Sequence, residues 1–253
     1  MHDVAADLKP PPAQPRGSRL VMLAVIAAGL VVAAAVAFAV TGLRPHQAQP
    51  TAPRVAGIPA SVPTSLVNLM ALTPVPNQAA PGFTLTDQAG RTLSLASFKG
   101  HAVVLEFMDP HCTDICPIVS REFLDAYHDL GSAAPHVVFI AVNVNAYHHG
   151  VADVAAFSRE QQLTAIPSWH FLTGPVAGLQ AVWTAYHVYV QAPSPDADIV
   201  HTSVIYFIDP SGTERFGASP MVDHTQNGTS YLPLTQQAAW AHGIALIARQ
   251  LAR

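Results

Sequence analysis

Residues 102–117 read Ala-Val-Val-Leu-Glu-Phe-Met-Asp-Pro-His-Cys-Thr-Asp-Ile-Cys-Pro, a short apolar run that passes into two cysteines and a proline. The run Ala102–Phe107 is typical of a buried strand. Pro117 can occupy the first position of a helix. Because a residue before a proline is biased away from helical backbone angles, we expect Cys112 and Cys116 on the loop that leads into this helix. The helix dipole would there stabilise a thiolate and lower the pKa of a thiol.

Cys112 and Cys116 are the only two cysteines in the 253 residues. Two thiols at this spacing either close a small, reversible disulfide or bind a soft metal ion as a pair of thiolates. A static disulfide would close a very short loop and add little stability through chain entropy. The residues themselves therefore favour a redox or metal role and leave these two open.

Strand and helix patterns alternate on both sides of this stretch. Residues 83–86 and 92–95 alternate in polarity around a turn, which predicts a hairpin. Alternating strands and helices indicate an α/β fold around a central sheet. Beyond 102–107, we expect strands at 136–142 and 203–208, and helices at 117–130, 151–163, 177–189 and from Leu234 to the C-terminus. Residues 211–233 are expected to be a surface loop.

The N-terminal part contains an uncharged apolar run at residues 21–40. About 20 such residues suffice to cross a bilayer as a helix. Arg16 and Arg19 precede the run, so the positive-inside bias favours a cytoplasmic N-terminus. The alternative is a cleaved signal peptide with a cleavage site at Ala37-Phe38-Ala39, but the run is longer than a typical signal core. We favour a retained anchor, and both interpretations place the cysteines where oxidation is possible.

The composition suggests four regions along the chain. Residues 1–19 are predicted to be a cytoplasmic tail and residues 20–42 a transmembrane anchor. Residues 43–80, rich in proline and alanine, are expected to be an extended linker. Residues 81–253 are expected to be one folded, extracytoplasmic domain. The net charge of −4 and the scattered basic residues give no case for nucleic-acid binding.

Several separate motifs resemble the Sco/SenC family of thioredoxin-like copper proteins. The most specific is Cys112-x-x-x-Cys116-Pro117, since thioredoxins themselves have one residue fewer between the cysteines. The others are Asp87-x-x-Gly90, Phe98-Lys99-Gly100, Trp169-His170-Phe171-Leu172-Thr173-Gly174, Val200-His201-Thr202 and Ile208-Asp209-Pro210-x-Gly212. The resemblance implies a thioredoxin-like α/β fold: a central mixed sheet flanked by helices, with an N-terminal hairpin, preceded by a single transmembrane helix.

The resemblance also implies a function. The copper ligands of the family fall on Cys112, Cys116 and His201, and two thiolates with one imidazole suit Cu(I) and can also hold Cu(II). The implied role is a membrane-anchored metallochaperone rather than an enzyme. Its acceptor would be the dinuclear copper centre in subunit II of cytochrome c oxidase, or another extracytoplasmic cuproprotein. Because the N-terminus lacks an Arg- and Ser-rich transit peptide, we expect a bacterial cell membrane.

Two further residues are candidates beside the cysteines. Asp114 either supports the ligands through hydrogen bonds or simply begins the helix. His111 is a candidate extra ligand or proton donor. The alternative function is a thiol-disulfide oxidoreductase that reduces target cysteines, in which one of Cys112 and Cys116 attacks and the other resolves.

Overall fold

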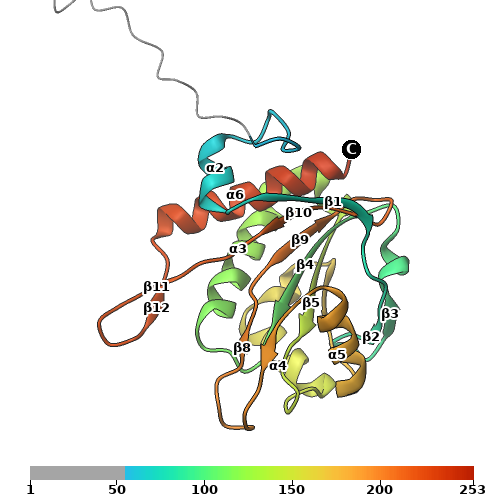
Figure 1. The fold of residues 1–253 in the computed structure, drawn as a ribbon, viewed down its shortest axis with the longest axis vertical. Coiled ribbons are helices and arrows are strands. Elements are labelled where there is room, and N and C mark those ends of the chain that lie inside the picture. Colours follow the sequence, from blue (N-terminus) through green and yellow to red (C-terminus); the bar gives the residue numbers. More distant parts are fainter. Residues whose placement is uncertain (1–54) are drawn as a thin grey trace, which may run out of the picture. The chain divides into compact units, whose positions relative to one another are not determined.

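A central sheet of six strands organises the computed structural model, which describes residues 55–253 (Figure 1). The strand order is β1-β10-β9-β4-β5-β6. The middle of the sheet is parallel: β4 (Ala102–Met108) pairs with β5 (Val137–Asn143), which pairs with β6 (Trp169–Leu172). On the other side, β9 (Ile205–Ile208), β10 (Thr213–Ala218) and β1 (Thr73–Ala79) continue the sheet in antiparallel pairs. The predicted mixed sheet is confirmed.

Alternate side chains of β4 face two different hydrophobic cores. Ala102, Val104 and Met108 point into a core that contains the buried faces of α3 (Ile115–Leu130), α4 (Val151–Glu160) and α6 (Leu234–Leu251). Val103, Leu105 and Phe107 point into a second core under α5 (Val176–Ala185) and the hairpin of β2 (Thr84–Thr86) and β3 (Thr92–Ser94). Because both faces are covered, every residue of β4 and β5 is buried, which is the reason for their continuous apolar sequence. This is the thioredoxin-like layered arrangement that the sequence predicts.

The folded unit begins earlier than predicted, and the linker assigned to residues 43–80 is wrong for its second half. Helix α2 (Thr64–Leu69) packs against α6, and Met70 just after it is fully buried. Strand β1 then forms the edge of the central sheet against β10. Its sequence, Thr-Pro-Val-Pro-Asn-Gln-Ala, contains two prolines, which are tolerated there because an edge strand leaves half its N–H groups unpaired.

The predicted surface loop at residues 211–233 is also corrected. Residues 213–218 are β10, which pairs with both β9 and β1. The turn between β9 and β10 was predicted correctly: Gly212 donates to the carbonyl oxygen of Asp209 at 2.8 Å and adopts a positive φ of 86°, which glycine adopts without a steric penalty. The rest of the segment forms a small hairpin of β11 (Asp223–His224) and β12 (Ser230–Tyr231).

The predicted tail at residues 1–19 and anchor at residues 20–42 lie outside the described residues. Within residues 55–253, no helix has both the length and the hydropathy required to cross a membrane.

Candidate metal centre

The cysteines lie where β4 ends, on the tight connection to α3. Asp109 sets this connection: its carbonyl oxygen accepts from the Cys112 N–H at 3.1 Å, and its Oδ1 accepts from the His111 N–H at 2.9 Å. The second bond is the Asx-turn that an Asp-Pro pair favours. Loops at the carboxyl ends of parallel strands are the usual place for sites in α/β folds.

Helix α3 begins at Ile115, two residues earlier than the sequence predicts, so Cys116 and Pro117 lie in its first turn rather than on the loop. The proline is tolerated because the first N–H groups of a helix have no partner within the helix. Cys112 remains on the loop. Its Sγ accepts from the Cys116 N–H at 3.4 Å, so the sulfur of Cys112 faces the helix N-terminus.

Neither thiol is part of a disulfide, and the two differ in their exposure to solvent and in their pKa. Cys112 is partly exposed and Cys116 is 2 % exposed. Hydrogen bonding from the Cys116 thiol, helped by backbone N–H groups, lowers the pKa of Cys112 to about 7 despite partial burial. The same interaction, together with burial, raises the pKa of Cys116 well above its usual value. At neutral pH, Cys112 is therefore the more readily deprotonated of the two thiols, and Cys116 keeps its proton.

His201 comes from a different part of the chain. It ends β8 (Val200–His201), which pairs with β7 (Val190–Gln191) in a small ribbon outside the main sheet. The strand that pairs with β4 in the main sheet starts four residues later, at Ile205. His201 thus precedes the sheet on a hairpin rather than lying in it.

The ring of His201 has one nitrogen free for a ligand. Its Nδ1 lies 3.0 Å from the carbonyl oxygen of Thr202. A carbonyl oxygen only accepts, so Nδ1 carries the hydrogen and the Nε2 lone pair is left for a metal ion. Burial lowers the pKa of His201, although the Thr202 carbonyl and the charge of Asp109 oppose this. The ring is therefore neutral at neutral pH, as a metal ligand must be.

Two of the three predicted ligands line one open groove of about 1010 Å³. Cys112 and His201 both line it, from segments that are far apart in the sequence. Asp109, His111, Asp114 and Ser203 are also part of its wall. The arrangement offers one reactive thiolate, a protonated thiol beside it and a neutral imidazole across a solvent-accessible space.

The two supporting candidates differ. Asp114 is the N-cap residue of α3, so it does begin the helix, but its side chain makes no helix-capping hydrogen bond. Its carboxylate accepts from the Ser230 hydroxyl of the β11–β12 hairpin. The ring of His111 stacks on that of His148 and its Nε2 lies 3.7 Å from Asp153 Oδ1.

Comparisons with known proteins identify the family of this chain. The family model SCO1/SenC matches residues 73–226. The chain belongs to the SCO1/SenC family. The bovine mitochondrial protein SCO2 homolog is 31 % identical over 144 residues, which are 53 % of this chain and 53 % of that protein. The SCO1 protein homolog of Bacillus subtilis is 25 % identical over 138 residues, 54 % of this chain and 71 % of that protein. The match thus spans about half the length of the bovine relative.

A solved member of the family has the same fold. The structure of Bradyrhizobium japonicum ScoI with copper bound aligns with a TM-score of 0.53 at 24 % identity, over 69 % of this chain and 99 % of that one. The SCO1/SenC match begins at Thr73, the first residue of β1, which supports the correction that this strand is part of the domain.

The sequence analysis missed the polar residues that connect the loops around the candidate site. Asn145, after β5, donates from Nδ2 to Asp109 Oδ1 at 2.9 Å and so ties the loop after β4 to the loop after β5. Its Oδ1 accepts the N–H groups of Tyr147 and His148, at 2.9 Å each. Asn143 and Asn145 are fully or almost fully buried. Their signal in the sequence was an Asn-x-Asn pair directly after a buried strand, where a buried amide needs several partners.

Proposed function

We propose that this protein is a membrane-anchored copper chaperone that binds one copper ion through Cys112, Cys116 and His201. The observation that carries the proposal is the shared groove, in which the low-pKa thiol Cys112 and the neutral ring of His201 face the same space. Two sulfurs and one imidazole nitrogen are a ligand set for Cu(I). The copper bound to a solved protein of the same fold, from Bradyrhizobium japonicum, supports this choice of metal.

Binding of Cu(I) must displace the thiol protons, and the two cysteines lose their protons at different pH values. Cys112 is already partly deprotonated at neutral pH, so it captures the ion first. Once Cu(I) is on that sulfur, the positive charge favours loss of the proton of Cys116, and His201 closes the set through Nε2. The open groove lets a thiolate of an acceptor replace one ligand at a time. Oxidation of Cys112 and Cys116 to a disulfide removes both sulfur donors, so the redox state controls loading.

The proposed acceptor is an extracytoplasmic cuproprotein, the dinuclear copper centre of cytochrome c oxidase subunit II in the first place. The proposed location follows from the sequence: the N-terminus in the cytoplasm, one span through a bacterial cell membrane, and residues 55–253 outside. A thiol pair that binds copper only when reduced suits a compartment in which oxidation competes.

Copper retention tests this proposal directly. The full chain is reduced, loaded with Cu(I) without oxygen, and challenged with a Cu(I) chelator. We expect one retained copper per wild-type chain and none in Cys112→Ser/Cys116→Ser. His201→Ala is expected to lose copper at chelator concentrations at least about tenfold lower than wild type, because one of three ligands is gone. His242→Ala, at an exposed position of α6 outside the groove, is the matched control and should behave as wild type.

The second candidate is a thiol-disulfide oxidoreductase, and the unequal thiols favour it specifically. A partly exposed Cys112 with a pKa of about 7 can attack a target disulfide, and the buried Cys116 can resolve the mixed disulfide. His201 separates the two functions, since it is a ligand in the first and a bystander in the second. If the wild type retains no copper and His201→Ala leaves the rate of disulfide reduction unchanged, the protein belongs to the second class.

A further inference from the structure

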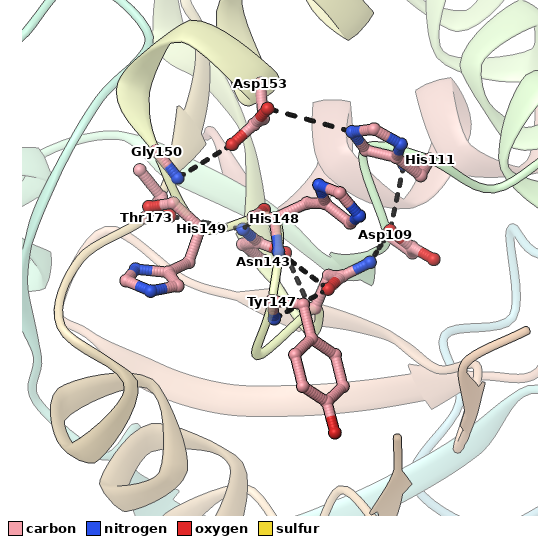
Figure 2. Close-up of polar contacts among 10 residues, drawn as sticks. Asp109, His111, Asn143, Tyr147, His148, His149, Gly150, Asp153 and Thr173 are labelled. Atoms are coloured by element: carbon pink, nitrogen blue, oxygen red, sulfur yellow. Dashed lines mark hydrogen bonds and ion pairs between the residues drawn. The ribbon is translucent and has the colours of Figure 1, made fainter. Parts of the chain in front are cut away.

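We propose that His111, His148 and Asp153 form a second metal site, for a divalent transition-metal ion of the Zn²⁺ or Cu²⁺ type. One nitrogen of each imidazole and one carboxylate oxygen of Asp153 all lie within 4.8 Å of one another. Figure 2 shows the three side chains converging from separate segments. The site uses none of Cys112, Cys116 and His201, so it stands independently of the copper centre proposed above.

The spacing of the donor atoms suits a bound ion better than direct contacts. His111 Nε2 and Asp153 Oδ1 are 3.7 Å apart, which is too long for a hydrogen bond. Two atoms bound to a tetrahedral zinc ion at about 2.0–2.1 Å lie about 3.4 Å from each other. The rings of His111 and His148 are stacked, with centroids 3.8 Å apart and an interplanar angle of 20°. The in-plane lone pairs of stacked rings run nearly parallel, so one imidazole must rotate about its side-chain bonds before both rings can point a nitrogen at one ion.

The backbone of each ligand is fixed by contacts that leave the donor atoms free. The N–H of His111 donates to Asp109 Oδ1 and the N–H of His148 donates to Asn145 Oδ1, each at 2.9 Å. Asp153, in the first turn of α4, accepts the Gly150 N–H with Oδ2 at 2.9 Å, which leaves Oδ1 toward His111. These contacts are drawn in Figure 2. Held in advance, the ligands lose less conformational entropy when an ion binds.

The scaffold has a second layer that fixes the loop after β5. Asn143 donates from Nδ2 to the carbonyl oxygen of His148 at 2.9 Å, and the Thr173 hydroxyl donates to the carbonyl oxygen of His149 at 2.8 Å. These bonds use the backbone carbonyl groups of His148 and His149. The imidazole of either residue can therefore be removed while the hydrogen bonds that hold the loop remain. This makes the site testable by substitution.

The donor set and its exposure indicate which ions it takes. Two imidazoles and a carboxylate are borderline and hard ligands, which suit Zn²⁺, Cu²⁺ or Ni²⁺ and lack the sulfur that Cu(I) prefers. The side chains of His111 and Asp153 are 50 % and 31 % exposed, so an ion can enter from solvent and complete its coordination with water. His111 and His148 line the same groove as Cys112. A divalent ion would therefore bind at the wall of the groove that contains the thiols.

Zinc binding by matched variants tests the site. In the full chain carrying Cys112→Ser, Cys116→Ser and His201→Ala, Zn²⁺ is titrated against a chromophoric chelator, and Co²⁺ absorption reports the geometry. We expect one Zn²⁺ that is held at least about tenfold more weakly after His148→Ala or Asp153→Asn. His149→Ala is the control. The His149 ring lies outside the cluster, with Nδ1 at 3.1 Å from the Gly174 carbonyl oxygen, so this variant should bind Zn²⁺ as tightly as its parent chain does.

The contrary results are equally defined. Equal Zn²⁺ affinity in the parent, His148→Ala and Asp153→Asn chains, or equal weakening by His149→Ala, would overturn the second site. Circular dichroism checks that each variant folds. If His148→Ala does not fold, Asp153→Asn decides the question, because its amide oxygen can still accept the hydrogen bond from the Gly150 N–H. Copper(I) retention by a His148→Ala chain with intact cysteines separates the two proposals: that chain should keep its Cu(I) whichever way the zinc result falls.

Discussion

At the scale of single residues, the chemistry depends on how differently two similar side chains are placed. Cys112 is on a loop with its sulfur facing backbone N–H groups, and Cys116 is inside the first turn of a helix, nearly without solvent contact. One shared proton between the two sulfurs lowers one pKa and raises the other. Such a pair can release its proton to bind a soft metal ion, or it can give up two electrons to a target disulfide and become a disulfide itself.

Thiol labelling tests this asymmetry. Because the thiolate is the reactive form and the pKa of Cys112 is lowered to about 7, iodoacetamide should modify Cys112 long before Cys116 in the reduced, metal-free chain. The rate should rise about tenfold from pH 6 to pH 8, as the thiolate fraction does. Peptide mass spectrometry gives both rates. In Cys116→Ala, which lacks the stabilising thiol, the midpoint for Cys112 should move to higher pH; an unchanged midpoint would contradict this account.

A buried carboxyl group beneath the thiols gives a prediction on stability. Glu106 is 1 % exposed, and burial raises its pKa from 4.5 to about 8. The folded state then keeps a proton that the unfolded chain releases above about pH 4.5. The free energy of unfolding should therefore fall as pH rises from about 5 to 8, by up to about 1.4 kcal/mol per pH unit from this group.

Glu106→Gln should remove that contribution, because glutamine does not titrate and can still bond to Ser203. Urea unfolding of wild type and variant at pH 5.5 and 7.5 gives the two slopes. Glu160→Gln, at an exposed position of α4, is the control and should keep the wild-type slope. Parallel slopes for wild type and Glu106→Gln would show that the carboxyl group is ionised in the folded state.

At the scale of elements, the sequence predicted the central strands β9, β4 and β5 and missed β1, β10 and β6, which lie toward the two edges of the sheet. The continuous apolar runs of β4 and β5 can be recognised in the sequence as buried strands, and the amphipathic patterns of α3 and α6 can be recognised as helices. Strands β1 and β10 read Thr-Pro-Val-Pro-Asn-Gln-Ala and Thr-Glu-Arg-Phe-Gly-Ala. Their prolines and charges are typical of loops, and only pairing with distant partners makes them strands.

The two candidate sites also differ in how far they can be recognised from the sequence. Cys112 and Cys116 are close in the chain and could be identified at once, and the family resemblance added His201. The cluster of His111, His148 and Asp153 could not be identified from the sequence, because it depends on where two loops and the first turn of α4 meet. His148 and His149 are neighbours in the sequence, yet the structure directs one ring into the cluster and the other to the Gly174 carbonyl oxygen.

Helix α2 and strand β1 should be essential for stability, because they are part of the folded domain and not of the linker that precedes it. Met70 is fully buried between α2 and α6. We expect Met70→Ala to lower the free energy of unfolding by about 2–5 kcal/mol, measured by urea unfolding. Ser65→Ala, exposed on α2, should change it by less than about 0.5 kcal/mol. A loss of less than about 1 kcal/mol for Met70→Ala would contradict this role.

At the scale of the whole molecule, the proposed copper ion would join two distant segments. Cys112 and Cys116 belong to the β4–α3 connection, and His201 belongs to the ribbon that precedes β9. The unfolded chain does not hold these three ligands together. Binding should therefore stabilise the folded state, in the way any ligand does that binds only the native protein.

Thermal unfolding without oxygen checks this. At a free Cu(I) concentration of about 100 times the dissociation constant, binding adds about 2.7 kcal/mol to the stability of the folded state. The Tm of the wild type should rise on loading, and that of Cys112→Ser/Cys116→Ser should not. The disulfide form of the wild type should also fail to respond, and should regain the response after reduction. An equal rise in Tm in all three forms would place the copper elsewhere.

The ligand set itself is the central claim, and X-ray absorption at the copper edge of the Cu(I)-loaded chain tests it most directly. We predict two sulfur neighbours and one imidazole nitrogen for the wild type, with the nitrogen contribution absent in His201→Ala. A wild-type spectrum with two sulfurs and no nitrogen, or one that His201→Ala leaves unchanged, would contradict the assignment of His201 and leave a copper site made by the cysteine pair alone.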